Sequence, residues 1–248
     1  MTFGKITIKS IIRRSGILIV VIFTTITCKN NSEADKNISA PDIVAFDQIP
    51  CYNEVYFGDT KFCLPEMKGF KECYKHPKVK SRADEIEDLD NTTLGYYLND
   101  ETYSKVNEIE DINYDNYYKI YAPIVGKDYN MTVSEMKQVM SMMSAGFIDR
   151  TLEETNEDIK KSGKGVQLSQ PILVEKFDLN DRSSSLLVLM RVSGVNVDKI
   201  MALSMSSILS MNRLIFVAHY LDYEDEKTIA KLKENTTTYI DAFQKANL

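Results

Sequence analysis

The strongest constraint on the fold is a group of four β-rich segments near the C-terminus, separated by only a few turn residues. They span residues 171–177, 185–192, 199–208 and 213–221. Connections this short join antiparallel neighbours, because a parallel pair of strands needs a crossover of a dozen or more residues. The segments therefore predict a four-stranded antiparallel meander.

One helix is predicted before this meander. It begins at Thr132, which can form a capping box with Glu135. Apolar side chains then recur at helical spacing and form one stripe, which consists of Met136, Val139, Met140, Met143 and Phe147. A weaker extension beyond Gly146 is expected to reach residue 159.

A second helix is predicted after the meander, over residues 224–246. Its acidic start suits the positive end of the helix dipole. One face is apolar and consists of Ile229, Leu232, Tyr239, Ile240 and Phe243. Such a face needs a sheet to pack against, so the helix is expected to cover the meander.

The first half of the domain adds further strands. Residues 55–57 and 61–64 flank Gly58-Asp59-Thr60, which predicts a hairpin. Strands are also expected at residues 94–98 and 117–122, whereas residues 100–115 fit either a short helix or a loop. Together these elements predict an α+β fold, with an antiparallel sheet of six or seven strands covered by helices.

The order of these elements resembles the PsbP-like fold. So do Lys61-Phe62-Cys63-Leu64-Pro65 leading into Gly69-Phe70, and Arg213-Leu214-Ile215-Phe216-Val217-Ala218 followed by Tyr223-Glu224-Asp225-Glu226. The resemblance covers nearly all of the domain and implies an α/β/α sandwich. Members of that fold include binding partners of a nuclear GTPase and extrinsic subunits of photosystem II. The resemblance therefore implies an interaction module, although a fold alone names no ligand.

The N-terminus has the pattern of a signal peptide. Basic residues, Lys5, Lys9, Arg13 and Arg14, precede an apolar run over residues 16–23 that is too short to span a membrane. The run ends in Thr24-Thr25-Ile26-Thr27-Cys28. This ending resembles the lipobox of bacterial lipoproteins, with Thr25-Ile26-Thr27 in place of the usual Leu-Ala-Gly. We therefore expect a signal peptide over residues 1–27 and a diacylated, palmitate-bearing Cys28; the alternative is an uncleaved membrane anchor.

The remaining chain divides into a tether and one domain. Residues 28–50 are mostly polar and are expected to form a flexible, lipidated tether. Residues 51–248 are sufficient for one α+β domain with a substantial core. The residue after the anchor is Lys29 and not Asp, which by resemblance to other lipoproteins favours the outer membrane of the cell envelope. The orientation toward the periplasm or the cell surface stays open.

The charge of the chain excludes some partners. The whole sequence carries 30 basic and 36 acidic residues, and residues 1–27 contain four of the basic and none of the acidic ones. Removing that segment changes the net charge from −6 to about −10. An acidic protein is a poor ligand for nucleic acid, whose binding depends on phosphate neutralisation. An acidic surface also argues against adhesion to anionic lipid, so attachment to a membrane is assigned to the lipid anchor at Cys28.

Three cysteines remain in the domain: Cys51, Cys63 and Cys73. The cell envelope is oxidising, so one disulfide is expected, and three pairings are open. We favour Cys63 with Cys73, because the intervening residues 64–70 can fold the chain back on itself. The spacings match no zinc site.

The other candidates for chemistry have simpler structural explanations. Met131, Met136, Met140, Met142 and Met143 could bind Cu(I), but most of them lie on the predicted helix stripe and fit a core better. The acidic residues over 84–90 could bind Ca²⁺ but lack an EF-hand pattern, which favours a solvated loop. His219 falls in an apolar strand, and His76 falls in a loop. We therefore assign no catalytic residue, and we expect neither a metal nor a cofactor.

Tyrosine is the unusual feature of the composition, with fourteen Tyr and no Trp. A dense group offers a possible binding surface, because Tyr provides large amphipathic area at little entropic cost. The group consists of Tyr96, Tyr97, Tyr114, Tyr117, Tyr118 and Tyr121. The competing explanation is that Tyr simply suits half-buried strands.

These inferences favour an exported, membrane-anchored lipoprotein whose domain is a non-catalytic binding or scaffold module. The expected partner is another envelope protein or a glycan. The alternative is a hydrolase that acts on envelope or nutrient polymers, and a third possibility is a structural subunit of a larger complex.

Overall fold

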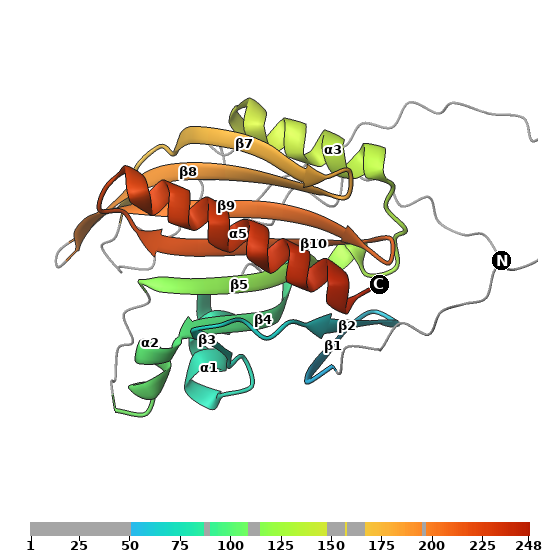
Figure 1. The fold of residues 1–248 in the computed structure, drawn as a ribbon, viewed down its shortest axis with the longest axis horizontal. Coiled ribbons are helices and arrows are strands. Elements are labelled where there is room, and N and C mark those ends of the chain that lie inside the picture. Colours follow the sequence, from blue (N-terminus) through green and yellow to red (C-terminus); the bar gives the residue numbers. More distant parts are fainter. Residues whose placement is uncertain (1–50, 87–89, 109–114, 148–156, 158–166, 195–196) are drawn as a thin grey trace, which may run out of the picture.

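The protein was analysed as a computed structural model, which describes residues 51–86, 90–108, 115–147, 157, 167–194 and 197–248. The fold is α+β and is built on an eight-stranded antiparallel sheet (Figure 1). The strands run in the order β3, β4, β5, β10, β9, β8, and both β6 and β7 pair with the outer side of β8. The predicted α+β class is confirmed, with more strands than expected.

The predicted meander is formed by the last four strands. They are β7 (Ile172–Asn180), β8 (Ser183–Ser193), β9 (Asp198–Ser210) and β10 (Arg213–Asp222), each antiparallel to the next. Met211 and Asn212 connect β9 to β10 with φ values of 47° and 60°. Two positive φ angles in a two-residue loop match the twist of the flanking strands, so this tight turn fixes the register of the longest hairpin.

The first half of the chain completes the sheet at its other end. It contributes β3 (Phe70–Glu72), β4 (Asn91–Asn99) and β5 (Asn116–Pro123). The short strand β6 (Gln167–Leu168) lies at the opposite end of the sheet, where it pairs with β8. The predicted hairpin forms from β1 (Asn53–Phe57) and β2 (Thr60–Leu64), but as a separate two-stranded sheet. The ambiguous region after β4 begins as a short helix, α2 (Asp100–Ser104), because the Asn99 side chain accepts from the Thr102 N–H.

The C-terminal helix α5 (Glu226–Ala246) crosses one face of the sheet, as predicted (Figure 1). Asp225 caps it by accepting from the backbone N–H groups of Lys227 and Thr228. Side chains that lie opposite one another on successive strands form a row beneath it. The row runs Glu175, Leu187, Ser204, His219, Tyr118, Tyr97, Glu72.

Side chains of α5 meet this row in order along the helix. Thr236 Oγ1 lies 2.7 Å from Ser204 Oγ, and the Tyr239 ring stacks on Tyr118 with centroids 5.3 Å apart. Small serine side chains on β9 let the helix approach the middle of the sheet, whereas aromatic rings fill the space toward β4. The helix therefore lies in a fixed position across at least four strands.

The opposite face of the sheet is covered by the other helices. Helix α3 (Val133–Met142) begins with the predicted capping box of Thr132 and Glu135. Its side chains pack on residues of β8, β9 and β10, and the buried set includes Met136, Val139, Met140 and Met143. Helix α1 (Pro77–Ile86) and α2 lie over β4 on this same face, with Val79 and Val106 packed against Tyr96 and Leu98.

Helix α3 is shorter than the sequence pattern suggests. A single turn of π-helix, Met143–Phe147, follows it, and Gly146 has φ 93°. A left-handed residue cannot continue an α-helix, so the expected extension of α3 through Gly146 is wrong. Residues 148–156 and 158–166 lie outside the described part of the chain.

Candidate interaction surface

The predicted tyrosine surface is wrong for four of its six residues. Tyr96, Tyr97, Tyr118 and Tyr121 are each at most 5% exposed. Neighbouring residues on a strand point to opposite faces, and helices cover both faces here, so alternation does not bring either set into solvent. Tyr117 is half-buried and stacks between Tyr96 and Tyr220. Tyr114 lies outside the described residues.

His219 is a core histidine. It has no exposed surface, its ring stacks on Tyr118 at 3.9 Å, and its Nε2 lies 3.0 Å from Asn116 Oδ1. Burial lowers the pKa of His219 to about 3, and the nearby Lys231 ammonium acts in the same direction. A general base works best with a pKa near the ambient pH, so this imidazole is unsuited to that role. His76 Nε2 likewise meets an amide, Asn107 Oδ1 at 3.2 Å.

The disulfide joins Cys51 to Cys63, with Cα atoms 5.5 Å apart. The expected pairing of Cys63 with Cys73 is therefore wrong. Cys51 lies just before β1 and Cys63 lies on β2, whereas Cys73 lies under α1 on the far face of the sheet. Its Sγ donates to Tyr96 O at 3.2 Å, and burial raises the pKa of the Cys73 thiol to about 12. Cys28 lies outside the described residues.

The acidic segment begins in a helix and not in the expected loop. Asp84, on α1, pairs with Lys80 at 2.7 Å and accepts from the Tyr74 hydroxyl. The Lys80 ammonium holds the pKa of the Asp84 carboxyl below its usual range. Residues 87–89 lie outside the described chain. Among the described residues, no group of three or more His, Cys, Asp or Glu side chains is arranged to hold a metal ion.

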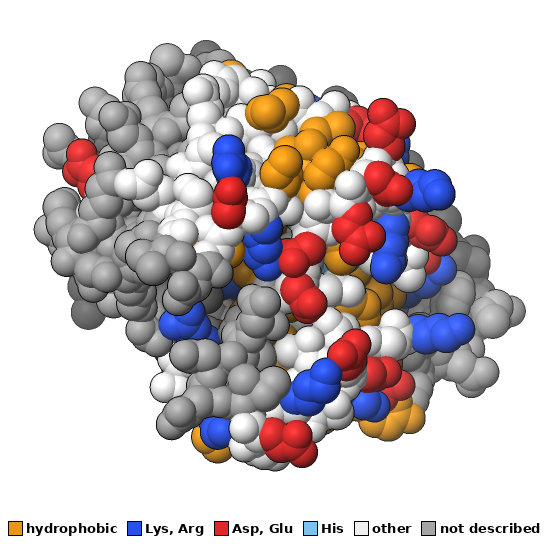
Figure 2. Space-filling model, turned by 90° about the vertical axis from the view of Figure 1, so that its left-hand side faces the viewer, with side chains coloured by type: hydrophobic (Ala, Val, Ile, Leu, Met, Phe, Trp, Pro, Cys, Tyr) orange, Lys and Arg blue, Asp and Glu red, His pale blue; other side chains and the backbone are white. Residues whose placement is uncertain are grey.

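The described surface instead exposes apolar side chains along the sheet edge formed by β7. The most exposed is Ile172 at 67%, followed by Leu173 at 45% and Val174 at 43%. Leu179 on the same strand and Ile200 on β9 are also exposed. Figure 2 views the molecule from the left-hand side of Figure 1 and shows hydrophobic side chains gathered in its upper part, with acidic and basic side chains near them. We call Ile172, Leu173, Val174, Leu179 and Ile200 the β7 surface.

Apolar groups of the β7 surface occur on both faces of the strand. Ile172 pairs with Leu189 on the α5 side, and Leu173 pairs with Val188 on the α3 side. The pairing with β8 is irregular between Leu173 and Glu175, and again between Phe177 and Asn180. No described strand pairs with the outer side of β7. Within the residues that the structure describes, the backbone groups on this side of β7 have no strand partner, which is the usual state of an edge strand.

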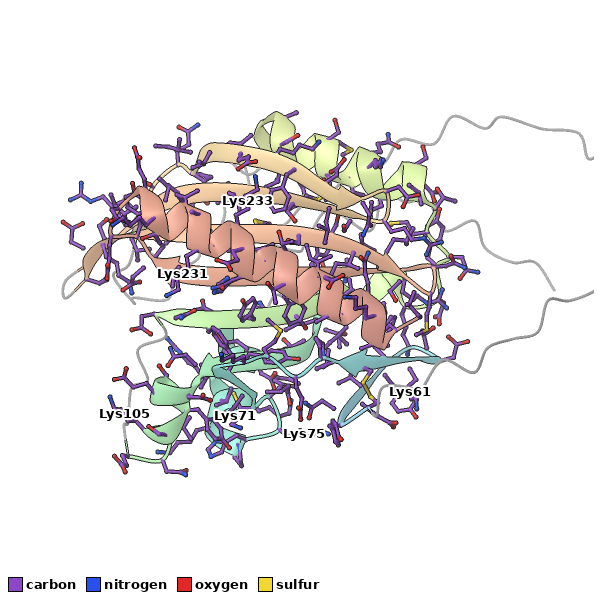
Figure 3. All side chains as sticks on the ribbon, in the orientation of Figure 1. Lys61, Lys71, Lys75, Lys105, Lys231 and Lys233 are labelled. Carbon is purple, nitrogen blue, oxygen red and sulfur yellow. A yellow bond between two sulfur atoms is a disulfide. The ribbon has the colours of Figure 1, made fainter. Side chains whose placement is uncertain are left out.

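Charged residues fix the position of the β7 edge. Lys231 and Lys233 both project from α5 in front of the sheet (Figure 3). Lys233 Nζ lies 2.5 Å from a Glu175 oxygen and 5.0 Å from the centre of the Phe177 ring. At the other end of the surface, Arg191 forms a bidentate ion pair with Asp198, in which both hydrogen bonds are 2.6 Å long. An apolar centre with a charged rim is typical of protein interaction sites.

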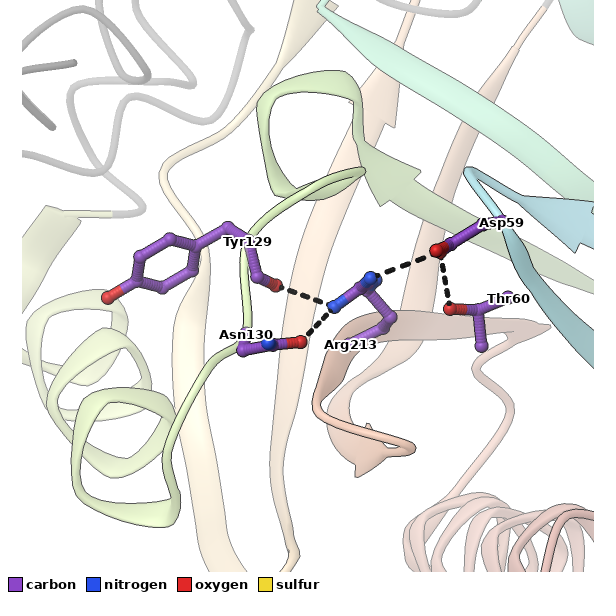
Figure 4. A network of polar contacts seen from close by, with 5 residues as sticks. All are labelled: Asp59, Thr60, Tyr129, Asn130 and Arg213. Atoms are coloured by element: carbon purple, nitrogen blue, oxygen red, sulfur yellow. Dashed lines mark hydrogen bonds and ion pairs between the residues drawn. The ribbon is translucent and has the colours of Figure 1, made fainter. Parts of the chain in front are cut away.

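A second polar network holds the hairpin on the domain and is structural. Arg213 is 7% exposed and stands at the first position of β10 (Figure 4). Its guanidinium donates to Tyr129 O, Asn130 Oδ1 and Asp59 Oδ1. The bond from Arg213 lowers the pKa of the Asp59 carboxyl. One arginine thus joins the β1–β2 turn to the segment before α3.

The sequence contains a signal for the β7 surface. Ile172-Leu173-Val174 is a run of consecutive apolar residues on a strand, with no alternation. Such a run is typical of a strand buried on both faces, as in the centre of a sheet. Only the strand order shows that β7 lies at an edge, where the same run is exposed.

Comparison with known proteins adds little. No protein-family model matches the sequence, and no curated protein matches it. The solved structure of the Ran-binding protein Mog1p of Saccharomyces cerevisiae is 10% identical, with 74% of this chain and 86% of that chain covered and a TM-score of 0.32. A Mog1 mutant is 8% identical over the same shares, with a TM-score of 0.30. Both likenesses are too low to indicate a partner.

Proposed function

We propose that this chain is an exported lipoprotein of the bacterial cell envelope, held at the outer membrane through Cys28, and that its domain is a non-catalytic binding module. The anchor is supported by the basic flank, the apolar run over residues 16–23 and the cysteine that ends the run. None of the described helices is long and apolar enough to cross a membrane. Two or more acyl chains would give a firm attachment.

The observation that carries the binding role is the β7 surface. Three consecutive apolar side chains are more than two-fifths exposed on β7, and no described strand pairs with the outer side of β7. Contiguous exposed apolar groups, especially with a polar rim, mark interaction sites in soluble domains. The proposed partner is a protein of the same compartment that covers this edge.

The PsbP-like assignment belongs to the same proposal. Helix α5 on one face, and α3 with α1 and α2 on the other, support an α/β/α sandwich. In that arrangement the apolar faces of the helices pack against the sheet. It agrees with an interaction module that binds its partner through the sheet edge.

The anchor is tested by Cys28→Ser in the full chain. The substitution should release the protein from membranes and abolish labelling with palmitate, while Cys73→Ser should change neither. Continued labelling of the Cys28 variant would refute the lipoprotein assignment.

The binding surface is tested with a matched pair of substitutions in cells. Val174 and Met211 are both 43% exposed, and Met211 lies in the β9–β10 turn, outside the β7 surface. Val174→Asp should abolish chemical cross-links between the protein and its envelope partner, and Met211→Asp should keep them. An unchanged cross-link pattern for Val174→Asp, with normal protein level, would place binding elsewhere.

A further inference from the structure

We infer that the partner of the β7 surface is a second copy of this chain, paired antiparallel along β7. The inference rests on the binding role proposed above and names its occupant. It follows from three features of β7 within the described part of the chain. No described strand pairs with its outer side, apolar side chains lie on both of its faces, and Lys176 and Asp178 become opposite charges when the strand is paired antiparallel with its own copy.

The symmetry of such a pair restricts its register. Two edge strands that extend one sheet antiparallel are related by a two-fold axis perpendicular to the sheet. The axis lies midway between one residue and the same residue of the second copy, because directly opposite residues must point to the same face. We call this residue the centre and say that the axis passes through it. Phe177 points toward α5, where Lys233 covers its ring, and Lys176 points to the α3 side beside Leu186. The axis can therefore be assigned by asking which charges each centre brings together.

Charge selects the centre at Phe177. An axis through Glu175, Lys176 or Asp178 places that residue opposite its own copy, and like charges directly opposite are destabilising. An axis through Phe177 instead places Lys176 opposite Asp178 of the second copy, twice by symmetry. It also places the two Phe177 rings opposite each other. An axis through Val174 brings no opposite charges together.

The local geometry of β7 agrees with this centre. Lys176 and Asp178 are both exposed, so neither side chain is committed to the core. Glu175, by contrast, is held by Lys233 of the same chain. Leu179 falls opposite Glu175 of the second copy, where the methylenes of Glu175 and Lys233 can cover it. The pairing of β7 with β8 is regular over residues 175–177, so Lys176 and Phe177 keep their strand register. The irregularities on either side of these residues limit indiscriminate edge pairing.

Attachment to one membrane favours a second copy over a dilute soluble partner. Lipid-anchored chains share a surface, which raises their effective concentration toward one another without any new contact. A weak edge contact, of the size expected for a short ladder with two ion pairs, is then sufficient for pairing.

Cysteine cross-linking of the full chain in its native membranes tests the register. Phe177→Cys should give a reducible dimer, because directly opposite residues have Cβ atoms about 5 Å apart. Leu173→Cys is the matched control: its copies should lie roughly 26 Å apart along the ladder, at about 3.3 Å per residue, and should stay monomeric. A dimer from Leu173→Cys without one from Phe177→Cys would overturn the assigned centre. Where Phe177→Cys reduces the protein level, coexpressed Lys176→Cys and Asp178→Cys copies serve instead.

Charge reversal tests the ion pairs. Lys176→Asp or Asp178→Lys alone should reduce the cross-linked fraction by roughly fivefold or more, since each breaks two contacts of the pair. The double exchange, Lys176→Asp with Asp178→Lys, should restore it. A monomer in all variants, while Val174→Asp still abolishes a cross-link to another envelope protein, overturns self-pairing and leaves the binding role intact. If no variant forms a dimer and Val174→Asp abolishes no cross-link to another envelope protein, both self-pairing and the binding role are refuted.

Discussion

Asn247 closes the fold by pairing its side-chain amide with the backbone of Cys63 in both directions. The Cys63 N–H donates to Asn247 Oδ1 at 2.7 Å, and Asn247 Nδ2 donates to Cys63 O at 2.8 Å. The same Nδ2 donates to Phe243 O at the end of α5. One side chain thus joins the last helix to the strand that carries the disulfide, across 184 positions of sequence.

Replacing Asn247 should therefore cost more than a usual helix-cap substitution. Asn247→Ala leaves a buried N–H and a buried C=O of Cys63 without partners, and each orphaned group costs about 1–3 kcal/mol. We expect the free energy of unfolding to fall by roughly 2–4 kcal/mol in urea titrations. Lys245→Ala, which removes only an exposed ion pair with Asp241, should change it by at most about 0.5 kcal/mol. Equal effects of the two substitutions would contradict the clamp.

Burial of His219 makes stability depend on pH. The folded protein keeps His219 neutral down to a pKa of about 3, whereas the unfolded chain takes up the proton below its ordinary value near 6.5. The unfolded state therefore binds more protons, so stability is complete above pH 6.5 and is lost as the pH falls toward 3. Between pH 7 and pH 5 the loss from this group should be about 2 kcal/mol.

Substitution of His219 tests this dependence directly. His219→Gln should flatten the change in unfolding free energy between pH 7 and pH 5, measured by denaturant titration at each pH. Thr238→Ala, at an exposed position of α5 without a titratable group, should keep the slope of the unmodified protein. A slope that survives His219→Gln would show that other groups cause it.

Met140 tests the interpretation of the methionines as core. It is 1% exposed and packs between α3 and the sheet. Met140→Ala should lower the unfolding free energy by about 2–5 kcal/mol through lost contacts and a cavity. Met211→Ala, at an exposed turn, should have little effect. A Met140 variant as stable as the parent protein would place that helix face in solvent.

Local patterns predicted the elements well, because their causes lie within a few residues. The Thr132–Glu135 capping box and the methionine stripe are both present where short-range chemistry places them. The break of α3 at Gly146 was also visible as a weak point, although its left-handed backbone was not.

Features that depend on long-range geometry were not predictable in this way. Cys63 pairs with Cys51, which lies just before β1, whereas Cys73 lies on another face of the sheet. Tyr96 and Tyr97 were expected at a surface, but the sheet is covered on both sides. The exposure of Leu173 depends on the strand order, which places β7 at an edge.

The C-terminal helix tests the architecture itself. Leu232, Tyr239, Ile240 and Phe243 have no exposed surface, because α5 lies across the sheet. An isolated helix of this length is marginal in water, so its stability comes from this packing. Burying four such side chains contributes roughly 1.5–3 kcal/mol each, which is comparable to the whole net stability of a typical domain.

Removing α5 should therefore unfold the domain, because the buried apolar face of the helix is lost. Deletion from Glu224 onward leaves β10 intact, yet it exposes the row that contains Ser204, His219 and Tyr118. We expect insoluble protein, or protein without a cooperative thermal transition. A graded version compares Phe243→Ala, which should cost about 3–5 kcal/mol, with Thr238→Ala at an exposed position, which should be neutral. A truncated protein that still melts cooperatively would make α5 an appendage, and the PsbP-like assignment would fall with it, since in that fold this helix is one of the covering layers.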